Sequence, residues 1–331
     1  MFVFVMRRLL TLIPVLIGVT LVIFSLSYIS LGDSVRAMMG QRGDPEVIAQ
    51  IRRDYGLDQP LHVQYARYMG RLLQGDLGRS YRQQRRVTDL IWERLPATLR
   101  LAAAAMLIAV VCGCTAGILA AIKPNAWIDR LLMVLALLGI STPVFWSAMM
   151  LILLFGSVLR WFPISGYGSG HVGYLILPAI TLGALQTGYI ARMTRSSLLD
   201  VLRQDYMQTA RAKGLRDTIV LCKHGLKNAA IPVVTVIGIS FADLLTGAPL
   251  TETIFAWPGI GRLMVNAVAN RDFPVVMGCT LVFALVYVLA NLGVDLLYAY
   301  LDPRIRYDRE CGIRLGAVTP PCWWEASCCW C

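Results

Sequence analysis

Long apolar segments separated by shorter charged ones dominate the pattern along the chain. A helix that crosses a bilayer needs about 20 mostly apolar residues, and six segments meet or approach that length. They are residues 9–31, 101–122, 131–159, 174–191, 229–250 and 275–300. The fourth is the most polar, since it contains Thr181, Gln186 and Thr187, and the second is entered from Pro96. The pattern therefore predicts an all-α membrane protein with six transmembrane helices.

Composition excludes the other broad classes of protein. Of the 331 residues, 57% are hydrophobic and 15% are charged, and the mean hydropathy is +0.61. Soluble domains carry about 25% charged residues, and disordered chains carry few apolar ones. In so apolar a chain, the net charge of +11 indicates cytoplasmic loops beside lipid rather than a nucleic-acid groove. The expected surroundings are the lipid bilayer, and no nucleic-acid partner is expected.

Basic residues predict the orientation of the helices, because cytoplasmic loops are enriched in Lys and Arg. The segment 192–228 holds eight of them, whereas the short loops expected outside hold only Arg160, Arg262 and Arg271. The first apolar segment exceeds the roughly 7–15 residues of a signal-peptide core, so we interpret it as a retained helix. Both termini are then cytoplasmic.

Four regions follow from this map. Residues 1–31 form the N-terminal transmembrane helix, and residues 32–95 form an outer segment of short helices. That segment is either a cap on the bundle or a docking surface. Residues 96–307 form a five-helix core that includes the cytoplasmic loop 192–228. Residues 308–331 hold five of the nine cysteines without periodicity, which predicts a disordered cytoplasmic tail.

The loop 192–228 is too long for a simple turn. An apolar stripe at helical spacing runs from Leu198 to Ala210, Gly214 interrupts it, and Asp217 can cap a second helix. The loop therefore predicts a helix, a sharp turn and a second helix. Such a unit could dock on another protein or lie on anionic lipid, and the pattern alone leaves both open.

Constellations that carry chemistry are missing from the sequence. No H-E-x-x-H pair, G-x-S-x-G elbow or phosphate-binding G-x-x-x-x-G-K-[ST] loop occurs, and the three histidines fall in predicted loops. We therefore expect no catalytic residue, no metal site and no cofactor. If transport here is driven by ATP, the nucleotide must bind another chain.

Polar residues within the spans are better candidates. A carboxylate in hydrocarbon costs about 2.5–3.5 kcal/mol on insertion scales, so Asp243 in the fifth span should face a cavity or a partner. It could line a path for an amine-bearing solute or make a structural hydrogen bond, and Gln186 is a second candidate for the path. Gly113 and Gly117 form a G-x-x-x-G pair, which predicts close helix packing.

Several motifs together carry a resemblance to a known family. The loop sequence D-Y-M-Q-T-A-R-A-K-G-L at 205–215 resembles the "EAA" loop of ABC importer permeases, with Gln208 where that motif names a glutamate. Further motifs typical of the dipeptide/oligopeptide/nickel branch stand at 7–14, 56–60, 75–78, 192–197, 223–235, 252–261, 271–275 and 302–306. The resemblance covers about residues 1–307.

The resemblance implies a six-helix type I permease bundle in the bacterial cytoplasmic (inner) membrane, with cytoplasmic termini. Its implied partners are a second, homologous permease in a heterodimer, two cytoplasmic ABC ATPases, and a periplasmic or lipid-anchored solute-binding protein. The chain itself would not be an enzyme, because the separate ATPases hydrolyse ATP. The alternative is an ATP-independent secondary transporter or channel, which often contains internal repeats, and no clear repeat occurs here.

Carried over residue by residue, the resemblance assigns roles to two segments. Thr209, Ala210 and Gly214 belong to a turn that sits in a cleft of an ATPase, which favours protein docking over lipid. The coupling segment comprises Tyr206, Thr209, Ala210, Arg211, Ala212, Lys213, Gly214 and Leu215. Trp257, Pro258 and Gly259 form either part of an outer vestibule or only a tight turn. Members of the branch carry dipeptides, longer peptides, nickel or metal chelates, glutathione and some sugars, of which small peptides are favoured here.

Overall fold

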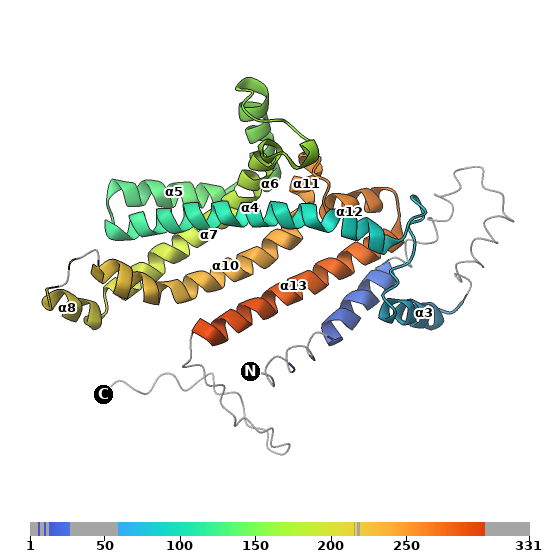
Figure 1. Cartoon of the computed structure of the whole chain (residues 1–331), viewed down its shortest axis with the longest axis horizontal. Helices are drawn as coiled ribbons and strands as arrows, with labels where there is room; N and C mark the ends of the chain where they lie inside the picture. Colours follow the sequence, from blue (N-terminus) through green and yellow to red (C-terminus); the bar gives the residue numbers. More distant parts are fainter. Residues whose placement is uncertain are drawn as a thin grey trace, which may run out of the picture.

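The computed structural model describes residues 6, 10, 13–26, 59–214, 216 and 219–301. Figure 1 shows long helices, α4, α7, α10 and α13, that run roughly along one axis. The elements α8 and α12 lie at opposite ends of this bundle, and we call these the α8 end and the α12 end. The predicted helix start at residues 44–46 and the tail 308–331 lie outside the described residues.

Helix α4 (Val87–Ile122) begins well before the predicted second span. Pro96 lies inside the helix rather than before it. Its last charged residue is Arg100, so the uncharged part matches the predicted span 101–122. The helix extends beyond that span because Val87, Leu90 and Ile91 are buried against Ile260 and Leu263 of α12 (Ile260–Ala269). Tertiary packing therefore continues the helix outside the apolar segment.

Close packing of α4 on α7 (Val172–Leu202) confirms the prediction from the glycine pair. A Cβ on Gly113 would lie 2.9 Å from the Cβ of Ile190. A Cβ on Gly117 would lie 2.5 Å from the Cβ of Thr194 and 2.6 Å from the carbonyl oxygen of Ala191. Only hydrogen fits at these positions, so the two glycines set the distance between the helices.

The predicted third span, 131–159, is not one straight helix. It comprises α5 (Trp127–Ser141), α6 (Val144–Leu151) and the π-helical segment η2 (Ile152–Val158), and the chain bends by 107° between α5 and α6. The bend lies at Thr142, whose φ of −80° and ψ of 130° are extended. Pro143 follows it, and a residue before proline is pushed out of the helical region. The two arms of the bend, α5 and α6 with η2, count as a single span only if both belong to the same crossing of the membrane.

The remaining elements complete the bundle. They are α3 (Leu61–Leu73), the 3-10 turn η3 (Gly168–Gly170), α8 (Asp205–Ala212), the π-helical η4 (Val220–Leu226), α10 (Lys227–Gly247), α11 (Pro249–Ile254) and α13 (Phe273–Leu301). The described residues contain four helices long and apolar enough to span a membrane, five with the bent pair, and a shorter apolar helix at Ile13–Leu26. Tyr65 of α3 contacts this short helix, because its hydroxyl lies 3.0 Å from Thr20 Oγ1 and its ring meets Phe24 edge-on.

Candidate functional site

The helix, turn and helix predicted for the loop 192–228 occupy the α8 end. The apolar stripe is split between two helices, because α7 ends at Leu202 and α8 starts at Asp205. Gly214 follows α8 with a φ of +76°, as predicted for a left-handed helix end, and the next described helix contains Val220. Asp217, the predicted cap, lies outside the described residues. Glycine suits this break because it reaches the left-handed region without strain.

Helix α8 is amphipathic and packs on its own subunit through one face. Met207 is fully buried and Ala210 is 9% exposed, in a cluster with Ala121 of α4, Leu198 of α7 and Val220 of η4. A side-chain hydrogen bond adds to this packing, since Asn228 Nδ2 donates to the hydroxyl of Tyr206 at 2.9 Å. The helix is thereby joined to three long elements of the bundle.

The opposite face of α8 is open. Tyr206, Thr209, Ala212, Lys213 and Gly214 are exposed, and a Cβ on Gly214 would meet no atom within 4 Å. Ala210 points to the other face, so Ala212 is the small residue left on the surface. Leu215 and the side chain of Arg211 lie outside the part of the chain that the structure describes. The open face offers both apolar and basic groups to a partner.

A partly buried ion pair joins α5 to α7, and the sequence patterns did not predict it. Arg195 of α7 binds Asp129 of α5 through two contacts, Nε to Oδ1 at 2.6 Å and Nη2 to Oδ2 at 2.7 Å. Asp129 is 3% exposed and also accepts the backbone N–H of Asn125 at 2.8 Å. The one available signal was a carboxylate in an otherwise basic turn, Lys123 to Arg130. The pair fixes the start of α5 to the part of α7 that leads into α8.

The two candidates for the translocation path have different surroundings. Gln186 of α7 is buried inside the subunit, with 4% of its surface exposed. Asp243 of α10 is exposed, on a face that it shares with Ile239 one turn earlier. A carboxylate on an open helix face within an apolar segment needs a cavity, water or a partner chain. Asp243 therefore suits an interface or path outside this subunit better than a hydrogen bond within it.

The predicted vestibule segment is a rigid corner at the α12 end. Trp257 is 2% exposed, and its Nε1 donates to the carbonyl oxygen of Ala97 at 2.9 Å. Its ring packs edge-on against Tyr167, at 4.9 Å between centroids. Pro258 is half-buried and Gly259 is buried. This packing ties the segment to α4 and to the turn before α7, so contacts within the chain fix its shape.

Glu252 begins the motif 252–261, but the sequence assigned it no role of its own. Its buried carboxylate accepts the hydroxyl of Thr98 at 2.7 Å and the backbone N–H of Arg262 at 3.0 Å. The same hydroxyl accepts the N–H of Ile260 at 2.9 Å. Burial raises the pKa of Glu252 above its ordinary value, although these hydrogen bonds oppose the rise. Gly259 is required beside it, because a Cβ there would collide with the carboxylate.

Comparisons with known proteins agree along nearly the whole chain. A family model described as "Binding-protein-dependent transport system inner membrane component" matches residues 113–307, and the corresponding N-terminal model matches residues 1–102. The dipeptide transport system permease protein DppB of Alkalihalophilus pseudofirmus is 45% identical over 93% of this chain and 100% of its own length. The glutathione transport system permease protein GsiC of Salmonella paratyphi A is 47% identical over 92% of this chain and 99% of its own.

Solved structures share the fold. Two inward-facing structures of the MetNI methionine ABC transporter superpose with TM-scores of 0.53 and 0.54. They cover 65% and 64% of this chain, and 97% and 96% of their own chains, at 17% and 18% identity. At this level of identity the likeness is one of architecture.

Proposed function

Because the chain belongs to the family of binding-protein-dependent transport system inner membrane components, we propose that it is one permease subunit of an ATP-driven importer of small peptides. The observation that carries this proposal is 45–47% identity to dipeptide and glutathione permeases over almost the full length of both chains. It favours the importer over an ATP-independent transporter or channel. Glutathione is itself a tripeptide, so both names point to small peptides, while nickel and metal chelates remain further candidates.

We propose six spans with both termini and the α8 end in the cytoplasm. The first span would include Ile13–Leu26, and the bent pair would count as one. Exposed tryptophans support this placement, because aromatic residues concentrate at the two membrane interfaces. Trp92 lies near the start of α4 and Trp127 follows its end. Trp92 and Ile122 are separated by about 45 Å along the helix, which matches the roughly 40–45 Å of a bilayer with its headgroups.

We propose that the α8 surface receives the ATPase. The resemblance implies that Thr209, Ala210 and Gly214 belong to the turn that sits in a cleft of the nucleotide-binding subunit. Because Ala210 is buried, we propose that Thr209, Ala212 and Gly214 form the contacting face. Met207 and Ala210 are packed in one cluster with residues of α4, α7 and η4. Because such packing leaves little free space, a displacement of α8 would displace these helices as well. Closure of the two ATPases would then switch the permease pair between inward-facing and outward-facing states. No bond of the solute is made or broken by this chain.

We further propose where the solute and the other partners lie. A sister permease would pack beside the open face of α10, so that Asp243 borders the path between the two subunits. There it could meet the amine of a peptide. A solute-binding protein, periplasmic or lipid-anchored, would deliver the peptide to the vestibule corner at Trp257. Gln186 lies inside the subunit and would support the shape of the path rather than contact the peptide.

Uptake into proteoliposomes that hold the complete importer tests this function. We expect ATP-dependent uptake of a labelled dipeptide in the wild type, and a loss of at least about tenfold in Gly214→Asp, because a charge is placed where the ATPase docks. Aspartate tolerates the left-handed backbone better than most residues. The matched control is Gly214→Asn, because asparagine has nearly the same shape as aspartate and tolerates the same φ of +76° but carries no charge. Equal uptake in the wild type and Gly214→Asp, with or without ATP, would refute the proposal.

A further inference from the structure

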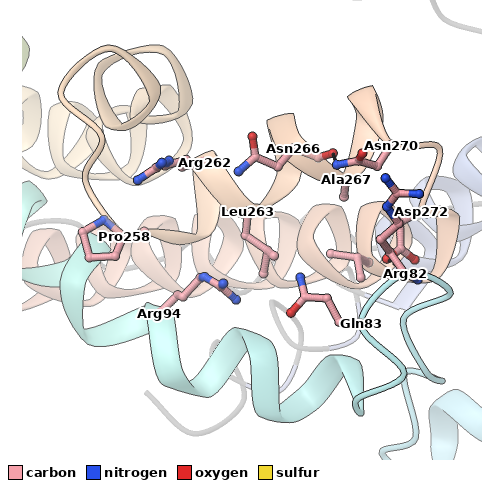
Figure 2. A pocket seen from close by; sticks show the side chains of 12 residues that line it. Arg82, Gln83, Arg94, Pro258, Arg262, Leu263, Asn266, Ala267, Asn270 and Asp272 are labelled. Carbon is pink, nitrogen blue, oxygen red and sulfur yellow. Dashed lines mark hydrogen bonds between the residues drawn. The ribbon is translucent and has the colours of Figure 1, made fainter. Parts of the chain in front are cut away.

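A pocket rich in arginine lies at the α12 end, beside the vestibule corner. It has a volume of about 270 Å³. Its polar lining comes from the turn before α4, from α4 and from α12, and comprises Arg82, Gln83, Arg94, Arg262, Asn266 and Asn270. Figure 2 shows Arg94 and Gln83 on one side of the pocket and Arg262 and Asn266 on the other. Guanidinium and amide groups from three separate segments therefore surround one hollow.

The positive charge of this pocket is not neutralised within the described part of the chain. Arg94 donates to the carbonyl oxygen of Leu90 at 3.3 Å, and Arg262 donates to that of Ala256 at 2.7 Å. Neither they nor Arg82 form an ion pair among the described residues. Each guanidinium has five N–H donors, so most remain available to a ligand.

Asp272 is the one acidic side chain in the lining, and its oxygens are occupied. It accepts the hydroxyl of Ser80, the backbone N–H of Tyr81 at 3.0 Å and that of Arg82 at 3.4 Å. These bonds hold the turn that carries Arg82 and Gln83 in place. Asp272 therefore shapes the pocket, and the three arginines leave it with a net positive charge.

Size and lining limit what the pocket can hold. Its volume is below the roughly 300–1,000 Å³ of pockets that enclose a whole small-molecule ligand. The floor is apolar, formed by the buried residues Leu263, Ala267 and Val275, while Arg82, Gln83, Asn266 and Asn270 at the rim are exposed. Arg94 and Arg262 in the lining are half-buried, so a carboxylate carried inward on a short aliphatic stem can meet guanidinium groups below the exposed rim. One glutamate or aspartate side chain inserted from outside fits this description.

We propose that the pocket is the anchor for an acidic side chain of the solute-binding protein, which inserts when that protein docks. This inference rests on the proposed function, in which the α12 end faces outward. The surface beside the pocket supports a protein rather than a solute, since Arg79, Arg82 and Arg86 of the turn before α4 are all exposed. Such a basic surface complements an acidic protein face and speeds its encounter, whereas a zwitterionic peptide has no need of one. Docking at this pocket also places the partner beside the vestibule corner, because Pro258 and Gly259 line the pocket.

Docking of the binding protein to the complete importer tests the proposal. The probe is the solute-binding protein of the same system, without solute, added to importer in uncharged phosphatidylcholine nanodiscs. We expect its Kd to rise about tenfold or more in Arg82→Gln/Arg94→Gln, and its salt dependence to weaken. Asn266→Asp should also weaken docking, because a carboxylate at the exposed rim competes for the guanidinium groups. The matched control is Arg79→Gln/Arg86→Gln, an equal loss of two charges in the same turn but outside the pocket.

Two results would overturn the proposal. One is a Kd that Arg82→Gln/Arg94→Gln and Asn266→Asp leave within about twofold of the wild type. The other is weakening that occurs only with peptide-loaded binding protein and disappears with a C-terminally amidated peptide, because the carboxylate would then come from the solute. In either case, uptake that still depends on Gly214 would leave the proposed function intact.

Discussion

Asp129→Ala should lower the free energy of unfolding by about 2 kcal/mol, within the range for losing hydrogen bonds between charged groups and less than the loss of a fully buried ion pair. The substitution removes both contacts to Arg195 and the acceptor for the N–H of Asn125. Arg195 keeps 27% of its side chain exposed, so its orphaned charge is partly hydrated. Thermal unfolding of the purified subunit measures the loss. Uptake should fall as well, since α5 is no longer fixed to the helix that leads into α8.

Asp200→Ala is the matched control for this prediction. Asp200 lies on α7, the helix that carries Arg195, and is exposed, so its removal should change stability by less than about 0.5 kcal/mol. The double variant Asp129→Ala/Arg195→Ala should be less destabilised than the sum of its single changes, because each single change leaves one partner unpaired. Strict additivity would show that the two side chains do not interact in the folded protein.

Gly117→Ala should force α4 and α7 apart, at a cost of about 1–3 kcal/mol. The new methyl group would lie 2.5 Å from the Cβ of Thr194 and 2.6 Å from a backbone oxygen that cannot move alone. Because Thr194 precedes Arg195, the shift should also strain the ion pair to Asp129. The thermal midpoint of the purified subunit and the rate of peptide uptake should both fall.

Gly293→Ala is a control for which we expect no loss of stability. Gly293 lies within α13, and no atom stands within 4 Å of a Cβ placed there. Alanine favours a helix over glycine by about 1 kcal/mol, so this variant should be as stable as the wild type or slightly more so. If Gly117→Ala behaved in the same way, α4 and α7 would not be in the close contact described here.

Local patterns were sufficient to predict much of the helical organisation. The uncharged length of 101–122, the spacing of Gly113 and Gly117, and the break at Gly214 each depend on residues close together in the sequence. The structure confirms the helix, the close packing and the left-handed glycine. In each case one local property, such as the length of an apolar segment or the steric freedom of glycine, is sufficient to determine the structure.

Features that depend on distant contacts or on direction could not be predicted in this way. An apolar run shows that 131–159 avoids water, but not that Thr142 and Pro143 turn the chain by 107°. Thr98 and Glu252 are 154 residues apart, and Asp129 and Arg195 are 66 apart. Such pairs form because the fold brings them together, and no periodicity encodes them. The arginine pocket likewise draws its lining from three separate segments.

Photocrosslinking from Thr209 tests the central claim most directly, namely that α8 binds to a separate ATPase subunit. A photoreactive amino acid replaces Thr209 on the exposed face of α8, and in a parallel variant it replaces Leu107, which is 66% exposed on the apolar part of α4. In membranes that contain the complete importer, we predict that Thr209 crosslinks to the ATPase subunit and Leu107 does not. Crosslinks from Thr209 to lipid alone, with the ATPase present and assembled, would contradict the account.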